Sequence, residues 1–215
     1  MIDSTDFTIP GTGTLKNKLG ITGPDDFSRT AADFTAIRLA ELQISPIGGG
    51  FDSTHLQAIH HHIYQDLYDW AGELRQIDTG NVPPSQVEKS LNNVLDRLSR
   101  ESHLKGLSAE EWAHSASGYL LDLGAIQPFL AGNEIVLHEF AVELARKNNL
   151  TLQWDKTPDL AADSIALLCQ VEQSANLRRL IMLAMDTTPI AQHSSHSHAL
   201  EQGIERILSI GSPYI

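Results

Sequence analysis

Apolar residues recur every three to four positions over most of the chain, which is the spacing of amphipathic helices. Only residues 151–154 read as a short extended stretch. The pattern predicts helices over residues 31–42, 54–70, 85–103, 109–124, 134–148, 159–173, 175–185 and 197–209. We therefore expect an all-α protein with six to nine helices.

Residues that favour helix ends mark several of these boundaries. Asp25 or Asp26 is the expected cap of the first helix, and Ser53 or Thr54 opens the second. Ser108 is followed three residues later by a glutamate, the spacing of a capping box. This box predicts the start of the helix that leads into residue 127.

The stretch from residue 125 to residue 140 is a short loop that turns into a helix. Pro128 disfavours helix in the residue before it, Gly132 can adopt positive φ, and Asn133 can cap the following helix. Such a turn offers unpaired backbone N–H groups at the positive end of a helix dipole, which favours an anion. An ordinary helix start is the alternative interpretation.

This stretch resembles the signature loop of the Fic family, whose pattern is His-Pro-Phe-x-(Asp/Glu)-Gly-Asn-Gly-Arg-x-x-Arg-x-Phe. Residues 13–20 and 51–75 also resemble the family, the second through Tyr-Asp-Trp-Ala-Gly-Glu-Leu-Arg. The resemblance implies a Fic-like helical bundle. The chain then divides into a lead-in (1–12), a Fic-like domain (13–190) and a His-rich linker with a final helix (191–215).

The loop departs from the family pattern where the chemistry resides. Fic enzymes transfer AMP, or another phosphate-bearing group, from a nucleotide onto a protein hydroxyl. They use a general-base His, an acidic Mg²⁺ ligand and two phosphate-binding Arg. The base position here is Gln127, the metal position is Ala131, the Gly-Arg pair is Glu134-Ile135, and the later Arg is His138. The retained residues build the loop's shape, and they are Pro128, Phe129, Gly132, Asn133 and Phe140.

These replacements remove the means of AMP transfer. A Gln127 amide cannot accept a proton at neutral pH, and a general base contributes roughly 10²–10⁴-fold to the rate. Ala131 cannot bind Mg²⁺, which prefers carboxylate oxygens. Glu134 reverses the sign of the local field where phosphates would bind. We therefore expect that AMP transfer is lost and that the protein carries no cofactor.

The replacing residues suggest a different chemistry. Glu134 and His138 lie four residues apart and so share one helix face. Together with Gln127 they would supply a base, an acid and an amide donor as catalytic residues. The loop formed by Pro128, Phe129, Gly132 and Asn133 would bind a carboxylate or a developing oxyanion. An ordinary surface pair on a helix is the alternative for Glu134 and His138.

Residues 76–84 correspond, by the resemblance, to the β-hairpin flap that Fic enzymes use to hold a target protein. Here the segment is shorter, and residues 79–81 read as a tight turn. We expect a short vestigial hairpin, which offers little edge for pairing with a peptide. Ordinary variation in loop length is the alternative explanation.

The C-terminal residues contain a candidate regulatory segment. Ser197 and Glu201 match the spacing of an inhibitory helix found in some Fic proteins, Ser/Thr-x-x-x-Glu-Gly/Asn, although Gln202 departs from it. His138 stands where the partner Arg would be, which suggests a Glu201–His138 contact. A helix start with a solvent-facing glutamate is the alternative.

Histidines invite a metal interpretation that the spacing does not support. Successive helical residues point about 100° apart, so His60, His61 and His62 cannot all face one ion. The spaced histidines of the tail, His193, His196 and His198, lack a Cys or carboxylate at ligand spacing. We expect no metal site.

The composition of the chain limits the kinds of partner that we expect it to bind. The formal net charge is −12, which disfavours nucleic acid and anionic membranes. The single cysteine, Cys169, allows no internal disulfide. No apolar run of membrane-spanning length and no signal pattern is present, so a cytoplasmic protein is expected. The sequence does not determine the oligomeric state.

Three functions are compatible with these features. The first is acid/base chemistry on, or binding of, a small molecule in the altered pocket. The second is a non-catalytic partner or regulator of another protein, for example of an active Fic enzyme. The third is residual nucleotidyl or phosphoryl transfer from an unusual donor.

Overall fold

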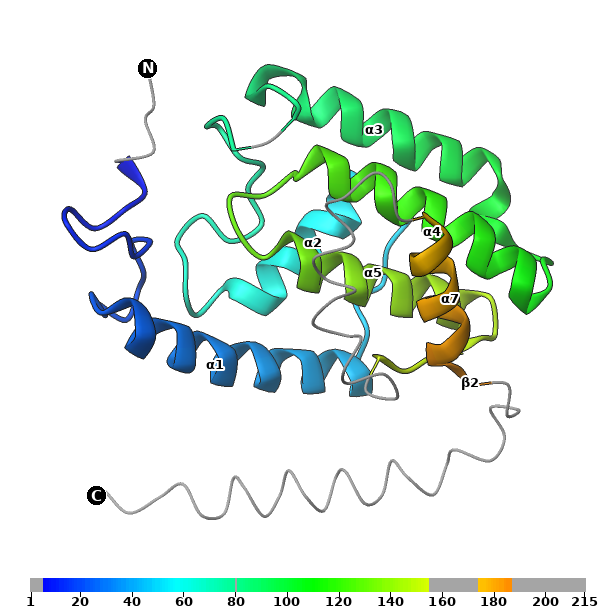
Figure 1. The fold of residues 1–215 in the computed structure, drawn as a ribbon, viewed down its shortest axis with the longest axis horizontal. Helices are drawn as coiled ribbons and strands as arrows, with labels where there is room; N and C mark the ends of the chain where they lie inside the picture. The colour runs from blue at the N-terminus through cyan, green and yellow to red at the C-terminus, as the bar shows by residue number, and fades with distance from the viewer. Residues whose placement is uncertain (1–5, 80, 155–173, 187–215) are drawn as a thin grey trace, which may run out of the picture.

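A computed structural model describes residues 6–79, 81–154 and 174–186 of the 215-residue chain (Figure 1). The elements, in order, are α1 (Pro24–Ile44), α2 (Ser53–Tyr64), α3 (Pro84–Arg100), the 3-10 turn η2 (Ser102–Leu104), α4 (Ala109–Ile126), α5 (Asn133–Lys147), β1 (Thr151–Leu152), α7 (Ser174–Ala184) and β2 (Met185–Asp186). β1 and β2 pair antiparallel, with Thr151 opposite Asp186. The expected all-α fold is confirmed.

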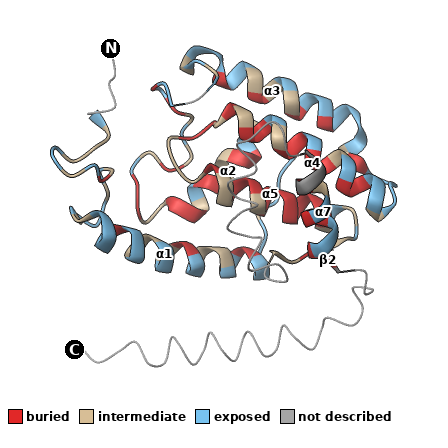
Figure 2. Cartoon of the chain, in the orientation of Figure 1, coloured by how far each residue is buried: buried red, intermediate tan, exposed pale blue. Residues whose placement is uncertain are grey.

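Helix α5 lies at the centre of the bundle and is buried along most of its length (Figure 2). It packs against α2 and α4, while α3 and α7 pack against α4 and α1 packs against α2. Large side chains from these helices fill the core, among them Leu56, Leu91, Trp112, Leu137 and Phe140. The loop that precedes α5 is therefore fixed at both ends by packed helices.

One of the expected helix starts is wrong and two are confirmed, since α2 begins at Ser53 as expected. α1 begins at Pro24 with Gly23 as its N-cap, because proline suits the first helical position. Asp52 caps α2, where its side chain accepts a hydrogen bond from the backbone N–H of His55 at 2.9 Å. The Ser108 capping box is present, with the backbone N–H of Ser108 donating to Glu111 at 2.9 Å.

Helix α2 also ends earlier than its apolar stripe predicts. The stripe continues to Trp70, but the helix stops at Tyr64. Its carbonyl accepts hydrogen bonds from the N–H groups of both Leu67 and Tyr68, at 3.0 Å each, as the chain turns away. The remaining apolar residues of the stripe thus lie on a turn that faces the same core.

The expected hairpin near residues 75–83 is absent from the described residues, which carry no strand over 75–79 and 81–83. Instead, the guanidinium of Arg75 donates to the carbonyls of Ile77 at 2.9 Å and Val82 at 2.5 Å. The segment is a loop tied to its own arginine.

Of the helices expected after residue 154, the structure tests only one. The helix expected over 175–185 is confirmed as α7. The helices expected over 159–173 and 197–209, together with Cys169 and the tail histidines, lie outside the described residues. Within the described ranges, no helix combines the length and the apolarity that crossing a bilayer would require.

Candidate functional site

Asn133 holds the loop between α4 and α5, but it does not cap α5 as predicted. Gly132, with φ of 76°, is the N-cap of α5, and Asn133 is the first helical residue. The Asn133 side chain instead accepts from the N–H of Phe129 at 2.9 Å and donates to its carbonyl at 2.8 Å. Both amide atoms are thereby used to hold the turn at 129–133.

Glycine at position 132 is required for two independent reasons. Its positive φ is strained for any residue with a side chain. A Cβ atom there would also overlap the ring and the hydroxyl oxygen of Tyr64. Tyr64, which is buried, therefore lies directly against the loop backbone.

His60, on α2, packs against the loop between α4 and α5. Its Nδ1 accepts a hydrogen bond from the N–H of Gly72 at 2.8 Å, so its proton resides on Nε2, which donates to the carbonyl of Ala131 at 3.1 Å. The ring stacks on Phe129 with a centroid separation of 4.0 Å. Burial lowers the pKa of His60 to about 4, so the ring is neutral at pH 7.

A signal for this role was present in the sequence. His60 lies four residues after Leu56 and three before Ile63, on the apolar face of α2. His61 and His62 point elsewhere, to the carbonyl of Ala71 at 3.0 Å and to the Glu41 carboxylate at 3.1 Å. Of these three histidines, His60 is therefore buried against the loop, whereas His61 and His62 lie at the periphery.

Gln127 ends α4 in the left-handed conformation, with φ of 49°. Its side-chain amide donates to the carbonyl of Gly124 at 2.8 Å, which satisfies a carbonyl at the helix end. Its own carbonyl accepts from Nε of Arg75 at 2.6 Å, and the N–H of Arg75 donates to the carbonyl of Pro128 at 2.9 Å. The structure thus uses Gln127 to join α4 to the 75–83 loop.

His138 lies against a different part of the molecule from Gln127. Its ring stacks on Trp154, with centroids 4.5 Å apart and planes at 14°. Its Nε2 forms no hydrogen bond with any residue that the structure describes. Burial lowers the pKa of His138 to about 4. The ring behaves as a neutral packing group beside β1.

Glu134 occupies the first turn of α5, where its charge suits the helix dipole. Its charge acts on Tyr64. Burial, then the charges of Tyr68 and Glu134, raise the pKa of Tyr64. The phenol is therefore protonated at neutral pH. Tyr64 is thus a hydrogen-bond donor close enough to Glu134 for the carboxylate to affect its pKa.

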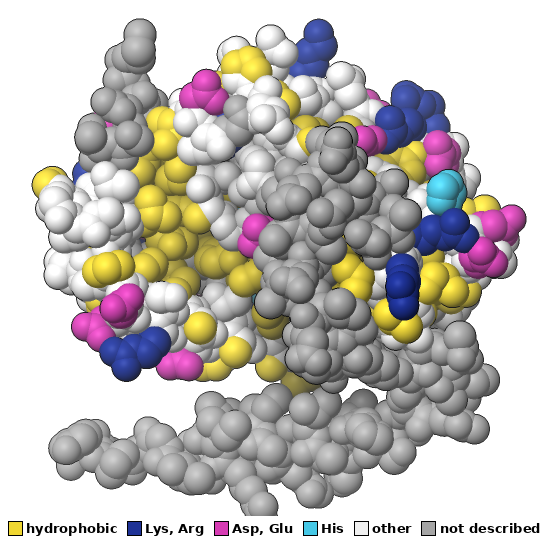
Figure 3. Space-filling view, in the orientation of Figure 1, with side chains coloured by type: hydrophobic (Ala, Val, Ile, Leu, Met, Phe, Trp, Pro, Cys, Tyr) yellow, Lys and Arg dark blue, Asp and Glu magenta, His cyan; other side chains and the backbone are white. Residues whose placement is uncertain are grey.

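Further aromatic rings pack next to Tyr64. Tyr68 and Trp70 stack with centroids 4.1 Å apart, and burial raises the pKa of Tyr68 to about 12. A small cavity of about 20 Å³ lies beside the loop, bounded by Trp70, Arg75 and Leu130 among others. Figure 3 shows apolar side chains gathered in a hollow on this face of the molecule. Among the described residues, no cluster of three or more His, Cys, Asp or Glu could hold a metal ion.

Comparison with known proteins identifies the family. Residues 50–145 match the Fic/DOC family. The chain is 31% identical over 153 residues to the Fic protein of Salmonella typhimurium, named a probable protein adenylyltransferase, which covers 69% of this chain and 76% of that protein. The protein belongs to the Fic/DOC family. It is also 36% identical over 155 residues to protein adenylyltransferase VbhT of Bartonella schoenbuchensis, over 70% of this chain. It spans only 32% of the length of VbhT.

Solved Fic structures share the fold. BepC of Bartonella tribocorum, with bound AMPPNP, aligns with a TM-score of 0.77 at 21% identity, over 86% of this chain and 98% of BepC. The N-terminal Fic domain of a Bartonella quintana effector, with bound ADP, aligns at 0.72 and 22% identity, over 85% of this chain and 95% of that one. The expected Fic-like helical bundle is confirmed.

Proposed function

We propose that this Fic protein does not transfer AMP and that its loop binds a small molecule that is neutral or positively charged. The observation that supports the proposal is that the loop keeps the residues that set its shape but not those that AMP transfer needs. Phe129, Gly132 and Asn133 keep its shape through the contacts described above. The positions of the base, the metal ligand and the two arginines hold groups that cannot perform those tasks.

Charge supports this ligand class. The loop over 127–134 contains no Lys or Arg, and it carries the carboxylate of Glu134. Arg75 lies next to the loop, but its guanidinium is buried and donates to four backbone carbonyls, those of Ile77, Val82, Ile126 and Gln127. The neutral His60 adds no charge. The loop itself therefore offers a polyphosphate one carboxylate and no lysine or arginine.

The chemistry available at this site is donation and acceptance of protons or hydrogen bonds. Tyr64 offers a hydroxyl donor over Gly132, and Glu134 offers an acceptor, so a ligand with a donor or an ammonium group would be matched. In this proposal Glu134 keeps its predicted role, and Tyr64 takes the place that the sequence reasoning gave to His138. Gln127 contributes to the shape of the site rather than to a reaction.

The decisive test uses ATP labelled at the α-phosphate. Purified protein is incubated with Mg²⁺, labelled ATP and a cell extract, and an active family adenylyltransferase is run in parallel. We expect no labelled protein from this chain. Labelling that disappears in the Gln127→Ala variant would contradict the proposal.

A thermal-shift panel tests the ligand class. A ligand present at 100 times its Kd stabilises a protein by roughly 2.7 kcal/mol, so amines and neutral aromatic compounds that bind will raise the Tm. We expect ATP with Mg²⁺ to leave the Tm unchanged. Tyr64→Phe, which removes only the hydroxyl, should weaken a hit by about fivefold, because one hydrogen bond is lost. A hit unaffected by both Tyr64→Phe and Glu134→Gln would place its binding elsewhere.

A second candidate is a non-catalytic partner or regulator of another protein. It is favoured by the structural use of two predicted catalytic side chains, since Gln127 bonds the end of α4 and His138 packs on Trp154. Gel filtration with an intact Fic enzyme tests this candidate. A shared peak would support it, and separate elution together with a hit in the thermal-shift panel would favour the first function. The predicted regulatory residues Ser197 and Glu201 lie outside the described residues.

A further inference from the structure

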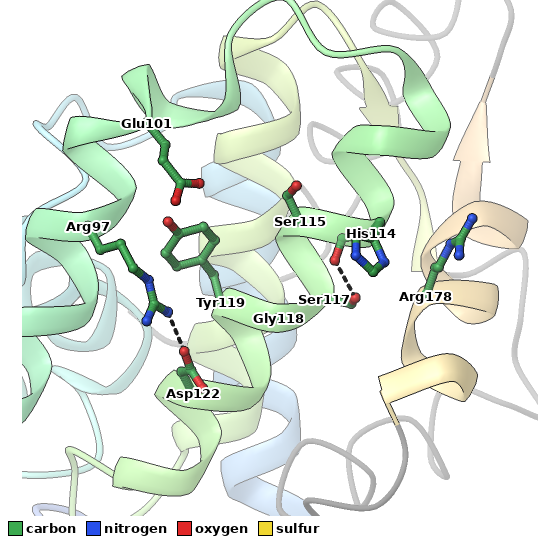
Figure 4. Close-up of a pocket in the computed structure, with 9 residues that line it drawn as sticks. All are labelled: Arg97, Glu101, His114, Ser115, Ser117, Gly118, Tyr119, Asp122 and Arg178. Atoms are coloured by element: carbon green, nitrogen blue, oxygen red, sulfur yellow. Dashed lines mark hydrogen bonds and ion pairs between the residues drawn. The ribbon is translucent and has the colours of Figure 1, made fainter.

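A second cavity lies away from the loop, between α3, α4 and α7 (Figure 4). Its volume is about 440 Å³, which is in the range of small-molecule sites. None of the residues that line it belongs to the 127–134 loop, so it is separate from the site described above. Its lining contains side chains of both charges.

The floor of the cavity is a stretch of α4 with small side chains, including Ser115 and Gly118. A glycine inside a helix destabilises it relative to alanine. Close packing does not explain the glycine at position 118, because a Cβ there would meet nothing within 4 Å. The missing side chain leaves the α4 backbone open to the cavity.

One end of the cavity presents a carboxylate. Glu101, at the end of α3, is directed toward the hydroxyl of Tyr119 (Figure 4), and it forms no ion pair with the described residues. The neighbouring Arg97 is already engaged, since it pairs with Asp122 and lies 4.8 Å over the Tyr119 ring. This end therefore suits a positively charged group.

The other end presents a guanidinium. Arg178, on α7, pairs with Glu110 at 2.5 Å, and the Glu110 side chain is 70% exposed. Ion pairs between solvent-exposed side chains contribute little stability. A ligand carboxylate can therefore replace Glu110 at small cost. This end suits a negatively charged group.

We propose that this cavity binds a zwitterionic small molecule whose two charges are separated by a body of several atoms, of the class that includes dipeptides. Its ammonium group lies at Glu101, its carboxylate lies at Arg178, and its body crosses the floor at Gly118. The lining carries two arginines and two acidic residues, so a ligand without net charge matches it. The Ser115 hydroxyl offers a further polar contact.

Titration calorimetry with alanyl-alanine tests the proposal, with the same dipeptide acetylated and amidated as the matched control ligand. We expect the free dipeptide to bind with a Kd of about 1 mM or lower. Loss of both charges should weaken binding by about tenfold or more, since each charge has a counterpart in the cavity.

Three variants and a control locate the binding. Glu101→Gln and Arg178→Gln should each weaken binding by about fivefold, because each removes one ionic contact. Gly118→Leu fills the floor and should abolish binding, while its circular dichroism spectrum reports that the fold is kept. Arg100→Gln, on α3 but outside the lining, should bind as the unmodified protein does.

Several outcomes would overturn the proposal. One is no heat of binding for alanyl-alanine at about 10 mM, ten times the expected Kd. Another is equal affinity for the free and the blocked dipeptide. A third is unchanged affinity in both Glu101→Gln and Arg178→Gln, which remain informative if Gly118→Leu does not fold.

Discussion

His60 shows how a single buried residue connects distant parts of the chain. Its two ring nitrogens bond to Gly72 and to Ala131, which lie 12 and 71 residues away. No other described side chain joins α2, the turn at Gly72 and the 129–133 loop in this way. The loop's position therefore depends on this ring as well as on residues of the loop.

His60→Ala should destabilise the protein by about 2–4 kcal/mol. The substitution leaves a cavity under Phe129 and removes partners from two backbone groups. Urea unfolding followed by circular dichroism measures the change. His61→Ala is the matched control, because His61 is exposed, and it should cost less than about 1 kcal/mol. Equal losses in the two variants would contradict the role assigned to His60.

At the scale of elements, two helices contain a glycine for different reasons. Gly132 begins α5 because its φ is positive and because Tyr64 occupies the space of a side chain. Gly118 lies inside α4 with open space beside it. The same substitution should therefore have opposite effects at the two positions.

Gly132→Ala should destabilise the protein by about 2–4 kcal/mol, from a strained backbone and a steric clash. In a Tyr64→Ala background the clash is gone, so the substitution should cost only the backbone strain, roughly 1–2 kcal/mol. Unfolding free energies of the four proteins in this cycle measure the coupling. Strictly additive effects would show that Tyr64 does not restrict position 132.

Gly118→Ala should stabilise the protein by about 0.5–1 kcal/mol, because alanine is the better helix former and its methyl group meets no neighbour. The midpoint of urea unfolding checks this. Ser115→Ala, one turn earlier on the same floor, is the comparison, and it should change stability less. A destabilised Gly118→Ala protein would mean that the cavity floor is more closely packed than the structure indicates.

At the scale of the whole molecule, buried titratable groups make the free energy of unfolding depend on pH in opposite directions. Burial lowers the pKa of His60 and His138 to about 4 each. Burial and the nearby Glu143 raise the pKa of Glu139 to about 7. The two histidines therefore destabilise the fold as pH falls from about 6.5 toward 4. Glu139 destabilises it as pH rises from about 4.5 to 7.

Glu139→Gln should remove the second effect. Between about pH 4.5 and 7 the folded protein binds the Glu139 proton more tightly than the unfolded chain does, so stability from this group is lost as pH rises. The variant should gain up to about 3 kcal/mol relative to the unmodified protein between pH 5 and pH 8. Unfolding free energies at both pH values measure the change.

Glu88→Gln, an exposed carboxamide substitution on α3, is the control for this pH experiment and should follow the unmodified protein. A difference between Glu139→Gln and the unmodified protein that stays constant with pH would show that Glu139 does not titrate in this range.

The sequence alone determined the all-α class, the helix order and the family, because helix periodicity and the Tyr-Asp-Trp-Ala-Gly-Glu-Leu-Arg run are local signals. It also identified the loop and the departures from the family pattern. Residue types carry that information without any fold. The start of α1 was predicted wrongly, since Asp25 and Asp26 are good capping residues but lie inside the helix, whose N-cap is Gly23.

Only the tertiary structure decided what surrounds the loop. Arg75 bonds to carbonyls as far away as that of Gln127, and the ring of His138 stacks on Trp154. Tyr64 lies close enough to Glu134 for the carboxylate to raise its pKa. These outcomes depend on contacts between residues far apart in the chain, and no local pattern of residues encodes which distant group will fill a given space.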